Sequence, residues 1–316
     1  MTATLQNLYD DIKELIHQKF ETKTEEDTTL PEIVELYFNY NQGELNVSGV
    51  TSTEPLVFIF TGTELTQYSS GEFSGSNMFI DYGDGTIEKT TGRFGHTYEE
   101  SGTYKVKIYG VTSLGNYCFK NCTGLTSINI PNNVSSLGIQ CFYNCTGLTS
   151  IEIPSNVTSL GNDCFYNCTG LTSIEIPSNV TSLGARCFFG CTGLTSIEIP
   201  SNVTSLGTSC FARCTGLTSI EIPSNVTSLG ASCFFDCTGL TSIEIPDNVT
   251  SLGAYCFRGC TGLTSIILNW TDYNLITYQS GWIMDTNSNL KLYIPTGTTE
   301  DYIEADYPSD KLVESD

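Results

Sequence analysis

Basic residues are scarce in this chain. Among 316 residues there are 13 Lys and Arg against 35 Asp and Glu, which gives a formal net charge of −22 at pH 7. Most of such a molecule would repel a nucleic-acid backbone or an anionic lipid surface, so the composition argues against a nucleic-acid partner. Hydrophobic residues still make up 39% of the sequence, which suffices for packed cores and excludes a wholly disordered chain.

Long apolar runs are also missing. The longest strongly apolar stretch, residues 56–60, is far too short to cross a bilayer. A signal peptide needs a basic start and an apolar core, but Asp10, Asp11, Lys13 and Glu14 interrupt the first apolar segment. We therefore expect no membrane insertion and no export or anchor segment.

Histidine is nearly absent, because the sequence contains only His17 and His96. No histidine or cysteine is paired with a base, and no phosphate-binding loop is present. The sequence therefore predicts a protein that is not an enzyme, with no catalytic residues, no cofactor and no metal site.

Cysteine, in contrast, is abundant and strictly periodic. All fourteen cysteines fall into seven Cys-x3-Cys pairs that recur every 23 residues. The first members are Cys118, Cys141, Cys164, Cys187, Cys210, Cys233 and Cys256, and the second members are Cys122, Cys145, Cys168, Cys191, Cys214, Cys237 and Cys260. Scattered cysteines would indicate an oxidising compartment, whereas cysteines at repeat positions report architecture. A 23-residue period is typical of leucine-rich solenoids, whose coils share one core.

Residues 141–163 illustrate one coil. Apolar residues alternate with polar ones over residues 148–153, which predicts a short strand that ends at Pro154, and Gly161 allows a tight corner. The inward positions of this coil are Cys141, Phe142, Cys145, Leu148, Ile151, Ile153, Val157 and Leu160.

The patterns Leu-xx-Ile-x-Ile-Pro, Val-xx-Leu-Gly and Cys-Phe-xx-Cys, repeated every 23 residues, resemble the BspA-like leucine-rich repeats over residues 112–267. The resemblance implies a mainly β fold, a right-handed solenoid of seven coils. That family usually has alanine where Cys141 and its equivalents lie. Residues 268–316 keep the hydrophobicity but lose the spacing, so they are expected to form a C-terminal cap in which Trp270 and Trp282 cover the last coil.

Two thiols four residues apart on a turn share one face, so core packing, disulfides and a metal site must all be weighed. No histidine lies near the pairs, and zinc would need ligands from two coils. We favour buried free thiols that act as small apolar fillers, a core ladder of fourteen cysteines, over disulfides and over metal.

Carboxylates occupy one outward strand position in five successive coils. This glutamate row consists of Glu152, Glu175, Glu198, Glu221 and Glu244, with Asn129 and Ile267 at the equivalent end positions. Solubility and protection against sheet stacking explain such a row, and a site for cations or for a basic partner is the alternative.

Comparison of the coils with one another shows that they differ mainly around the turn segment opposite the strand. Aromatic and arginine residues are frequent there, as in recognition surfaces. This turn strip consists of Tyr143, Tyr166, Phe189, Arg213, Phe235 and Arg258. It is a candidate ligand-contact surface, and relaxed surface drift is the alternative.

The first 45 residues are acidic, and the apolar spacing of Leu5, Leu8, Ile12 and Leu15 predicts a short helix with a narrow apolar stripe. A second helix is predicted to begin near Leu30-Pro31. This order resembles the N-terminal attachment segment of phage virion proteins that carry BspA-like repeats. The resemblance implies attachment or oligomerisation, and a helical hairpin docked on the next domain is the alternative.

Residues 46–111 read as strands at 56–60, 78–82 and 104–108. The motifs at 81–86 (Asp-Tyr-Gly-Asp-Gly-Thr) and 96–98 (His-Thr-Tyr) resemble a PKD-type immunoglobulin-like β-sandwich. Asp81 and Asp84 are first of all turn formers, with calcium binding as the minor alternative, and His96 is expected to be a structural hydrogen-bonding residue.

The leading functional hypothesis is therefore a phage virion protein, a tail-associated or capsid-decorating fibre located in the virion. Its N-terminal helices are expected to bind other virion structural proteins and to form a homo-oligomer, while the solenoid contacts a host surface protein or glycan. The alternative is a BspA-like adhesin at the bacterial cell surface, which binds host matrix protein or other cells. A purely structural spacer is the third hypothesis.

Overall fold

The structure, a computed structural model, describes residues 55–66, 71, 73–270, 277–278, 281–305 and 307–315. All of them belong to one compact unit, residues 55–316. The segment predicted to form attachment helices, residues 1–45, lies outside the described residues.

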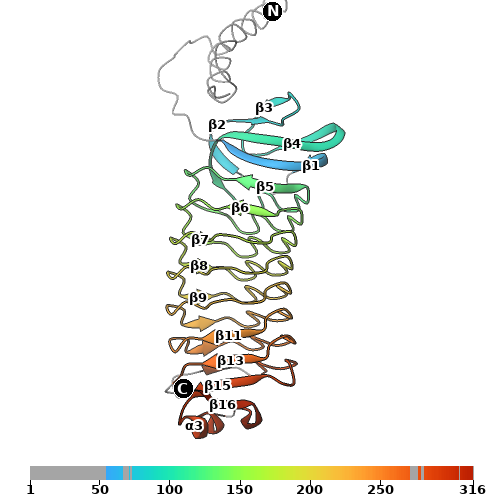
Figure 1. The fold of residues 1–316 in the computed structure, drawn as a ribbon. Helices are drawn as coiled ribbons and strands as arrows, with labels where there is room; N and C mark the ends of the chain where they lie inside the picture. Colours follow the sequence, from blue (N-terminus) through green and yellow to red (C-terminus); the bar gives the residue numbers. More distant parts are fainter. Residues whose placement is uncertain are drawn as a thin grey trace, which may run out of the picture. The chain divides into compact units, whose positions relative to one another are not determined.

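Most of the unit is a stack of short coils (Figure 1). Neighbouring coils pair through parallel strands in the register of the repeat, as in Ser127↔Ser150 and Ser242↔Ser265. One line of strands contains β5 (Leu125–Asn129), β6 (Ser150–Glu152), β11 (Ser242–Ile245) and β13 (Ser265–Leu268). A second line contains β7 (Ser159–Leu160), β8 (Ser182–Leu183), β9 (Ser205–Leu206), β10 (Ser228–Leu229) and β12 (Ser251–Leu252). The predicted mainly β solenoid, with one coil for each repeat of the sequence, is confirmed.

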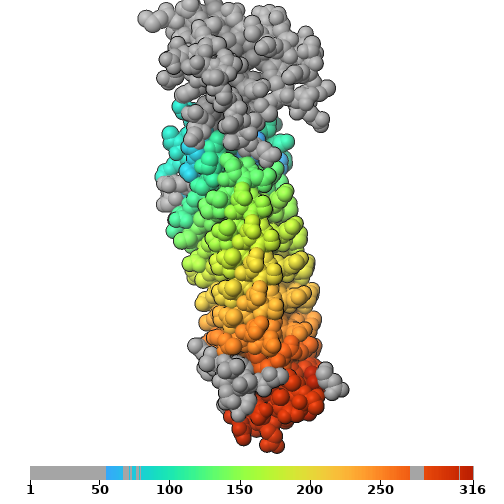
Figure 2. All heavy atoms as spheres, turned by 90° about the vertical axis from the view of Figure 1, so that its left-hand side faces the viewer, coloured from blue at the N-terminus to red at the C-terminus, as the bar shows by residue number. Residues whose placement is uncertain are grey.

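Figure 2 shows the coils from the side, where their colours follow one another from green to red. Each coil lies against the preceding and the following coil. A coil of this size cannot bury its apolar face alone, so the stacking itself creates the core.

The core is built from equivalent positions of every coil. The inward positions predicted for residues 141–163 are all buried, with exposed fractions of 7% or less. The phenylalanines that follow the first cysteine of each pair stack with ring centroids 5.3–5.6 Å apart and interplanar angles of 8° or less. This phenylalanine column consists of Phe119, Phe142, Phe165, Phe188, Phe211, Phe234 and Phe257.

The solenoid has an eighth turn that the cysteine spacing did not reveal. β14 (Thr277–Tyr278) pairs with β12, and β15 (Lys291–Pro295) pairs with β13 in the register Ser265↔Lys291. Trp282 continues the phenylalanine column, with its ring edge on Phe257 and the centroids 6.2 Å apart. The prediction of seven coils was therefore too low by one. The last coil was missed because it is longer than the others and carries no cysteine.

The last turn is followed by α3 (Thr299–Glu304), the 3₁₀ helix η2 (Ser309–Lys311) and β16 (Leu312–Ser315), which pairs with β15. Trp270 and Trp282 are both buried, and the Tyr302 hydroxyl donates to the Trp270 carbonyl at 3.1 Å. In the part of the chain that the structure describes, no helix is long and apolar enough to cross a membrane.

Four antiparallel strands precede the coils: β1 (Leu56–Thr66), β2 (Phe73–Asp81), β3 (Ile87–Lys89) and β4 (Gly95–Leu114). The sheet order β3-β2-β4-β1-β5-β6 runs directly into the first coils, because β1 pairs with β5. The rings of Phe58 and Phe94 lie 5.2 and 5.4 Å from that of Phe119. The N-terminal sheet thus covers the first end of the phenylalanine column.

This arrangement changes the interpretation of residues 46–111. The strands predicted at 56–60 and 104–108 lie within β1 and β4, the one predicted at 78–82 overlaps the end of β2, and β3 was missed. The described part of the region forms one sheet, so the PKD-like sandwich is not supported. Its apolar face packs on the first coil, where a sandwich would have a second sheet. The boundary predicted between residues 111 and 112 falls inside β4.

Candidate functional site

The glutamate row lies where the repeat pattern places it, on the outward side of the strand line. The register aligns Asn129 with Glu152, Glu152 with Glu175, and Glu244 with Ile267. All five glutamates are exposed. Their apolar strand neighbours, such as Ile151 and Ile153, point into the core and hold the carboxylates on one face.

No basic group neutralises this row within the described residues, where every ion pair involves an aspartate. Among the described residues, one side chain donates to the row: Asn269 Nδ2 bonds Glu244 Oε1 at 2.7 Å. Unit charges about 4.8 Å apart in water repel by about 1 kcal/mol before salt screening. The row therefore holds a small repulsion at each of its steps, which a cationic partner would relieve.

The turn segments contain two left-handed backbone positions in each coil. The residue before the first cysteine has φ between 54° and 60°, and the residue before the second has φ between 56° and 76°. Asn, Asp and Gly tolerate this conformation best. The second position holds such a residue in every coil except one, Arg213 (φ 60°).

The turn strip is largely engaged in contacts between neighbouring coils. The rings of Tyr143 and Tyr166 stack at 4.5 Å, and those of Tyr166 and Phe189 stack at 4.7 Å. The Arg213 guanidinium lies over the Phe189 ring at 5.6 Å. Because stacked neighbours cover the flat faces of the Tyr166 and Phe189 rings, little more than their edges remains for a ligand such as a sugar ring.

Arg213 is not equivalent to the other members of the strip. The strip position in its coil is held by Ala212, which is buried. The Arg213 side chain comes from the left-handed position next to it and reaches the Phe189 ring from there. The sequence alone could have shown this difference, because Ala212, and not Arg213, lies one repeat from both Phe189 and Phe235.

The cysteine ladder lies in the core, where all fourteen residues are buried with free thiols. The second members of the pairs have a polar role that the sequence did not reveal. From Cys145 to Cys260, each Sγ donates to the carbonyl of a phenylalanine in the preceding coil at 3.0–3.1 Å. Cys122 has no preceding coil, and its Sγ donates to the Thr66 carbonyl at 3.5 Å.

Burial makes these thiols weakly acidic, because a thiolate is poorly solvated in the core. It raises the pKa of Cys122, Cys210 and Cys260 to about 12. The same cause raises the pKa of Cys145 and Cys191 well above the ordinary range. Nucleophilic and metal-binding cysteines need the thiolate, so the arrangement favours packing over chemistry.

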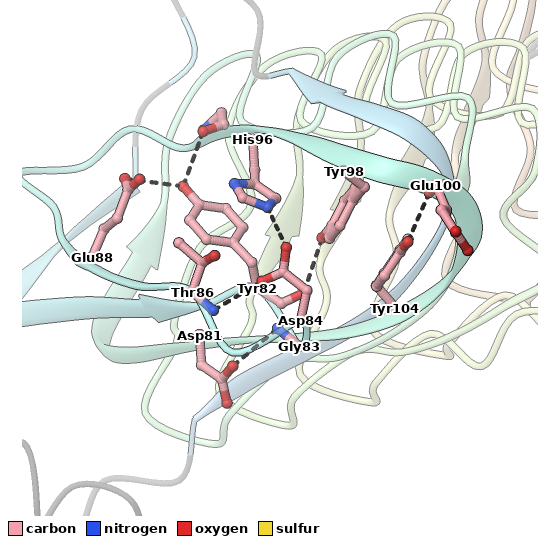
Figure 3. Close-up of polar contacts among 11 residues, drawn as sticks. Asp81, Tyr82, Gly83, Asp84, Thr86, Glu88, His96, Tyr98, Glu100 and Tyr104 are labelled. Atoms are coloured by element: carbon pink, nitrogen blue, oxygen red, sulfur yellow. Dashed lines mark hydrogen bonds and ion pairs between the residues drawn. The ribbon is translucent and has the colours of Figure 1, made fainter.

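The two motifs of the N-terminal sheet lie together (Figure 3). His96 Nε2 and Asp84 Oδ2 are 2.6 Å apart, and the His96 ring stacks on Tyr82 at 4.4 Å. The Tyr98 hydroxyl donates to the Tyr82 carbonyl at 3.0 Å. His96 is therefore part of a hydrogen-bonded structural cluster.

Asp81 and Asp84 fold the turn between β2 and β3. Their Oδ1 atoms accept the backbone N–H groups of Gly83 and Thr86, each at 2.9 Å. Although burial acts to raise it, the pKa of Asp84 is lowered, because the Thr86 N–H and His96 stabilise the carboxylate. Among the described residues, no three His, Cys, Asp or Glu side chains converge as metal ligands, so the calcium alternative gains no support.

A surface hollow beside Cys122 was not foreseen. It has a volume of about 400 Å³ and is lined by residues 60–66 of β1 and 121–124 of the first coil. The register of β1 against β4 shifts between Gly62 and Glu64, and this bulge shapes the wall. No spacing signal marks the hollow, because bulge and coil meet only in the fold.

Comparison with known proteins gave no match among curated proteins. Solved structures with similar folds include a leucine-rich repeat protein of T. pallidum (21% identity, 62% of this chain and 88% of that chain, TM-score 0.47). Others are a leucine-rich repeat protein of Bacteroides ovatus (23%, 74% and 80%, 0.29) and a leucine-rich cell surface protein of Faecalibacterium prausnitzii (22%, 78% and 94%, 0.30). Likeness at this level concerns the fold alone.

The family comparison is more direct. Six copies of the BspA type leucine rich repeat region match residues 97–217 and 186–301, which together cover most of the chain. The match extends beyond the seven cysteine pairs into the eighth turn. With this coverage and a fold of stacked coils, the chain belongs to the BspA type leucine-rich repeat family.

Proposed function

We propose that this protein is a non-enzymatic adhesin of a bacterial cell surface, and that the glutamate row is its contact surface for a basic region of a partner protein. The cell-surface placement follows from the BspA-like resemblance. The contact surface rests on one observation, the alignment of five exposed carboxylates that form no ion pair with a cation of the described residues.

The turn strip is the weaker candidate for this role. Its rings stack on one another, and its arginines pair with aspartates of adjacent coils, so a partner would have to break existing contacts. All Lys and Arg residues between 112 and 267 lie in the turn segments, at Lys120, Arg186, Arg213 and Arg258. The strand face is therefore the one that attracts a cationic surface at long range.

Binding to immobilised poly-L-lysine tests the contact surface, with poly-L-glutamate and neutral dextran as comparison surfaces. Changing all five glutamates of the row to Gln should abolish most of the binding to poly-L-lysine and flatten its salt dependence. A matched control neutralises five exposed acidic residues elsewhere by Glu99→Gln, Glu100→Gln, Asp247→Asn, Glu300→Gln and Glu304→Gln. Equal losses in both variants would mean that net charge alone acts.

A different result would support the alternative role of the row. If the five-Gln variant binds poly-L-lysine as before but aggregates, the carboxylates only keep strand faces of different molecules apart. Antibody staining of intact against permeabilised source cells tests the location, and staining confined to permeabilised cells would contradict it.

The virion hypothesis stays a prediction. It rests on residues 1–45, which lie outside the described residues. The expected homo-oligomer and the attachment to other virion proteins rest on the same residues. Mass spectrometry of purified particles is the direct measurement, because a structural protein would be recovered in fixed amount per particle. A glycan ligand and a spacer role are equally untested.

A further inference from the structure

The contacts between neighbouring coils fall into two kinds. The first kind is the same at every boundary between the seven coils that carry cysteines: the phenylalanine stack, the parallel backbone register and the thiol of each second cysteine bonded to the preceding coil. Contacts that repeat unchanged cannot distinguish one coil from the next. In a chain whose coils are nearly identical, they would allow a coil to stack on the wrong neighbour, including a coil of another molecule.

The second kind lies in the turn segments, and its residues and positions change from boundary to boundary, although some types of contact recur. At the first boundary Lys120 Nζ donates to Gln140 Oε1 at 2.7 Å, and at the second Tyr143 stacks on Tyr166. At the third, Arg186 Nε lies 2.8 Å from Asp163 Oδ1. The later boundaries are joined by Arg213 over Phe189, Arg213–Asp236 at 3.7 Å, Arg258 over Phe235, and Arg258–Asp285 at 3.0 Å.

We infer that these turn-segment contacts are a pairing code that fixes the order of the coils and disfavours stacking on the wrong coil, above all on a coil of a second copy of this chain. The clearest case is Asp163–Arg186, because no other coil carries a charged residue at that position and the pair is complementary only between true neighbours. A displacement by one coil would place Asp163 opposite Ser209 and Arg186 opposite Gln140, so that the ion pair is lost and only neutral side chains face the two charges. Such a code explains why the turn segments differ among coils, and it needs neither relaxed surface drift nor a ligand.

Backbone strain supports the same conclusion. Arg186 and Arg213 both have positive φ, at 54° and 60°, where a long side chain is disfavoured. In the equivalent positions some coils carry small residues, Ser209, Ser232 and Asn167, and others carry the long side chains of Tyr117, Gln140 and Tyr255, of which Gln140 also contacts an adjacent coil. Arginine at these positions is strained by itself, and its gain is the contact with the adjacent coil.

The test uses a variant in which the boundaries are made alike with small or neutral residues, most of which the chain already has at equivalent positions. The six changes are Asp163→Ser, Arg186→Ser, Tyr166→Ala, Arg213→Asn, Asp236→Asn and Arg258→Ala. Full-length chains with two different affinity tags are mixed unfolded under reducing conditions, refolded together, and assayed for co-purification. Mixing the same chains after folding measures the exchange that the native assembly permits.

We expect the six-change variant to give about tenfold more mixed species than the wild type after refolding. The control is Phe188→Leu, which weakens a contact that is the same at every boundary. It should lower stability and leave the mixed fraction at the wild-type level. The pairing code is wrong if the six-change variant and the wild type mix equally, or if Phe188→Leu mixes as much as the variant.

A second pair of variants covers the case in which the six-change variant fails to refold. Arg186→Asp places two carboxylates at the third boundary and should raise mixing. Adding Asp163→Arg restores an ion pair with the charges exchanged, and mixing should return to the wild-type level. If the double variant mixes as much as the single one, complementarity does not specify the neighbour and the proposal fails.

Discussion

Thiol reactivity gives the sharpest test of the core. At pH 8 an ordinary cysteine, with a pKa of about 8.5, is roughly one-quarter thiolate. Burial raises the pKa of Cys122 to about 12, which leaves a thiolate fraction of roughly 10⁻⁴. Even with free access, its alkylation should therefore be about 10³-fold slower than that of a free cysteine.

Access should then separate Cys122 from the other thirteen thiols. Its exposed fraction is 5% and it lines the surface hollow, whereas the other cysteines are fully enclosed. We expect fewer than one thiol to react with an aromatic disulfide reagent in the native protein at pH 8, and all fourteen to react in guanidinium chloride. Mass-spectrometric mapping should identify Cys122 as the first site to be modified.

Two variants make this order a strict test. Cys122→Ala should remove the slow first phase, while Cys210→Ala, which removes a fully buried thiol of similar pKa, should leave it unchanged. Fewer than fourteen thiols in denaturant would reveal disulfides and refute the packing argument. Rapid alkylation, in the native protein, of a cysteine that is the first member of its pair, such as Cys141, would show that the coils open far more readily than a continuous core permits.

Three further predictions concern stability. Cys191→Ala should cost about 1 kcal/mol more than Cys187→Ala in urea unfolding, because the Cys191 thiol donates to the Phe165 carbonyl and its loss leaves that buried oxygen with one bond fewer. Ser209→Gly should stabilise the protein by about 0.5–1 kcal/mol, because Ser209 has φ 54°, while Ser205→Gly in β9 should destabilise it by a similar amount. A carboxylate whose pKa is lowered by folding stabilises the protein above its ordinary pKa, and this contribution disappears as the pH falls through the lowered value. Hydrogen-exchange protection factors in the N-terminal sheet, which correct for the pH dependence of intrinsic exchange, should therefore fall below about pH 4 in the wild type and respond less to acid in Asp84→Asn.

Much of the fold could be predicted from the sequence because one period governs the core. Spacing alone places Phe142 on Phe165 and Glu152 beside Glu175, since every coil repeats the same inward and outward positions. The eighth turn was not predicted because it lacks the cysteine pair from which the coils were counted. Trp282 follows Phe257 at a longer interval than the phenylalanines keep among themselves, and the structure shows that a longer coil still closes on the same column.

The N-terminal sheet was misread for a different reason. The turn at residues 81–86 and the His96–Asp84 contact are local, and the same turn chemistry fits a sandwich or a single sheet. What decides between them is the partner of the apolar face, here Phe119 against Phe58 and Phe94. A contact between segments so far apart leaves no periodic signal in the sequence.

The turn segments, finally, show why equal spacing carries more information than any single coil. Asp163 and Arg186 lie one repeat apart, and so do Arg213 and Asp236, so the members of each pair come from successive coils. Opposite charges at that spacing attract across a boundary, whereas the equal charges of the glutamate row repel at the same spacing. A chain that needed only solubility would have no reason to alternate the sign. The strand face therefore keeps a uniform charge toward the solvent, and the turn face uses charge to join one particular coil to the next.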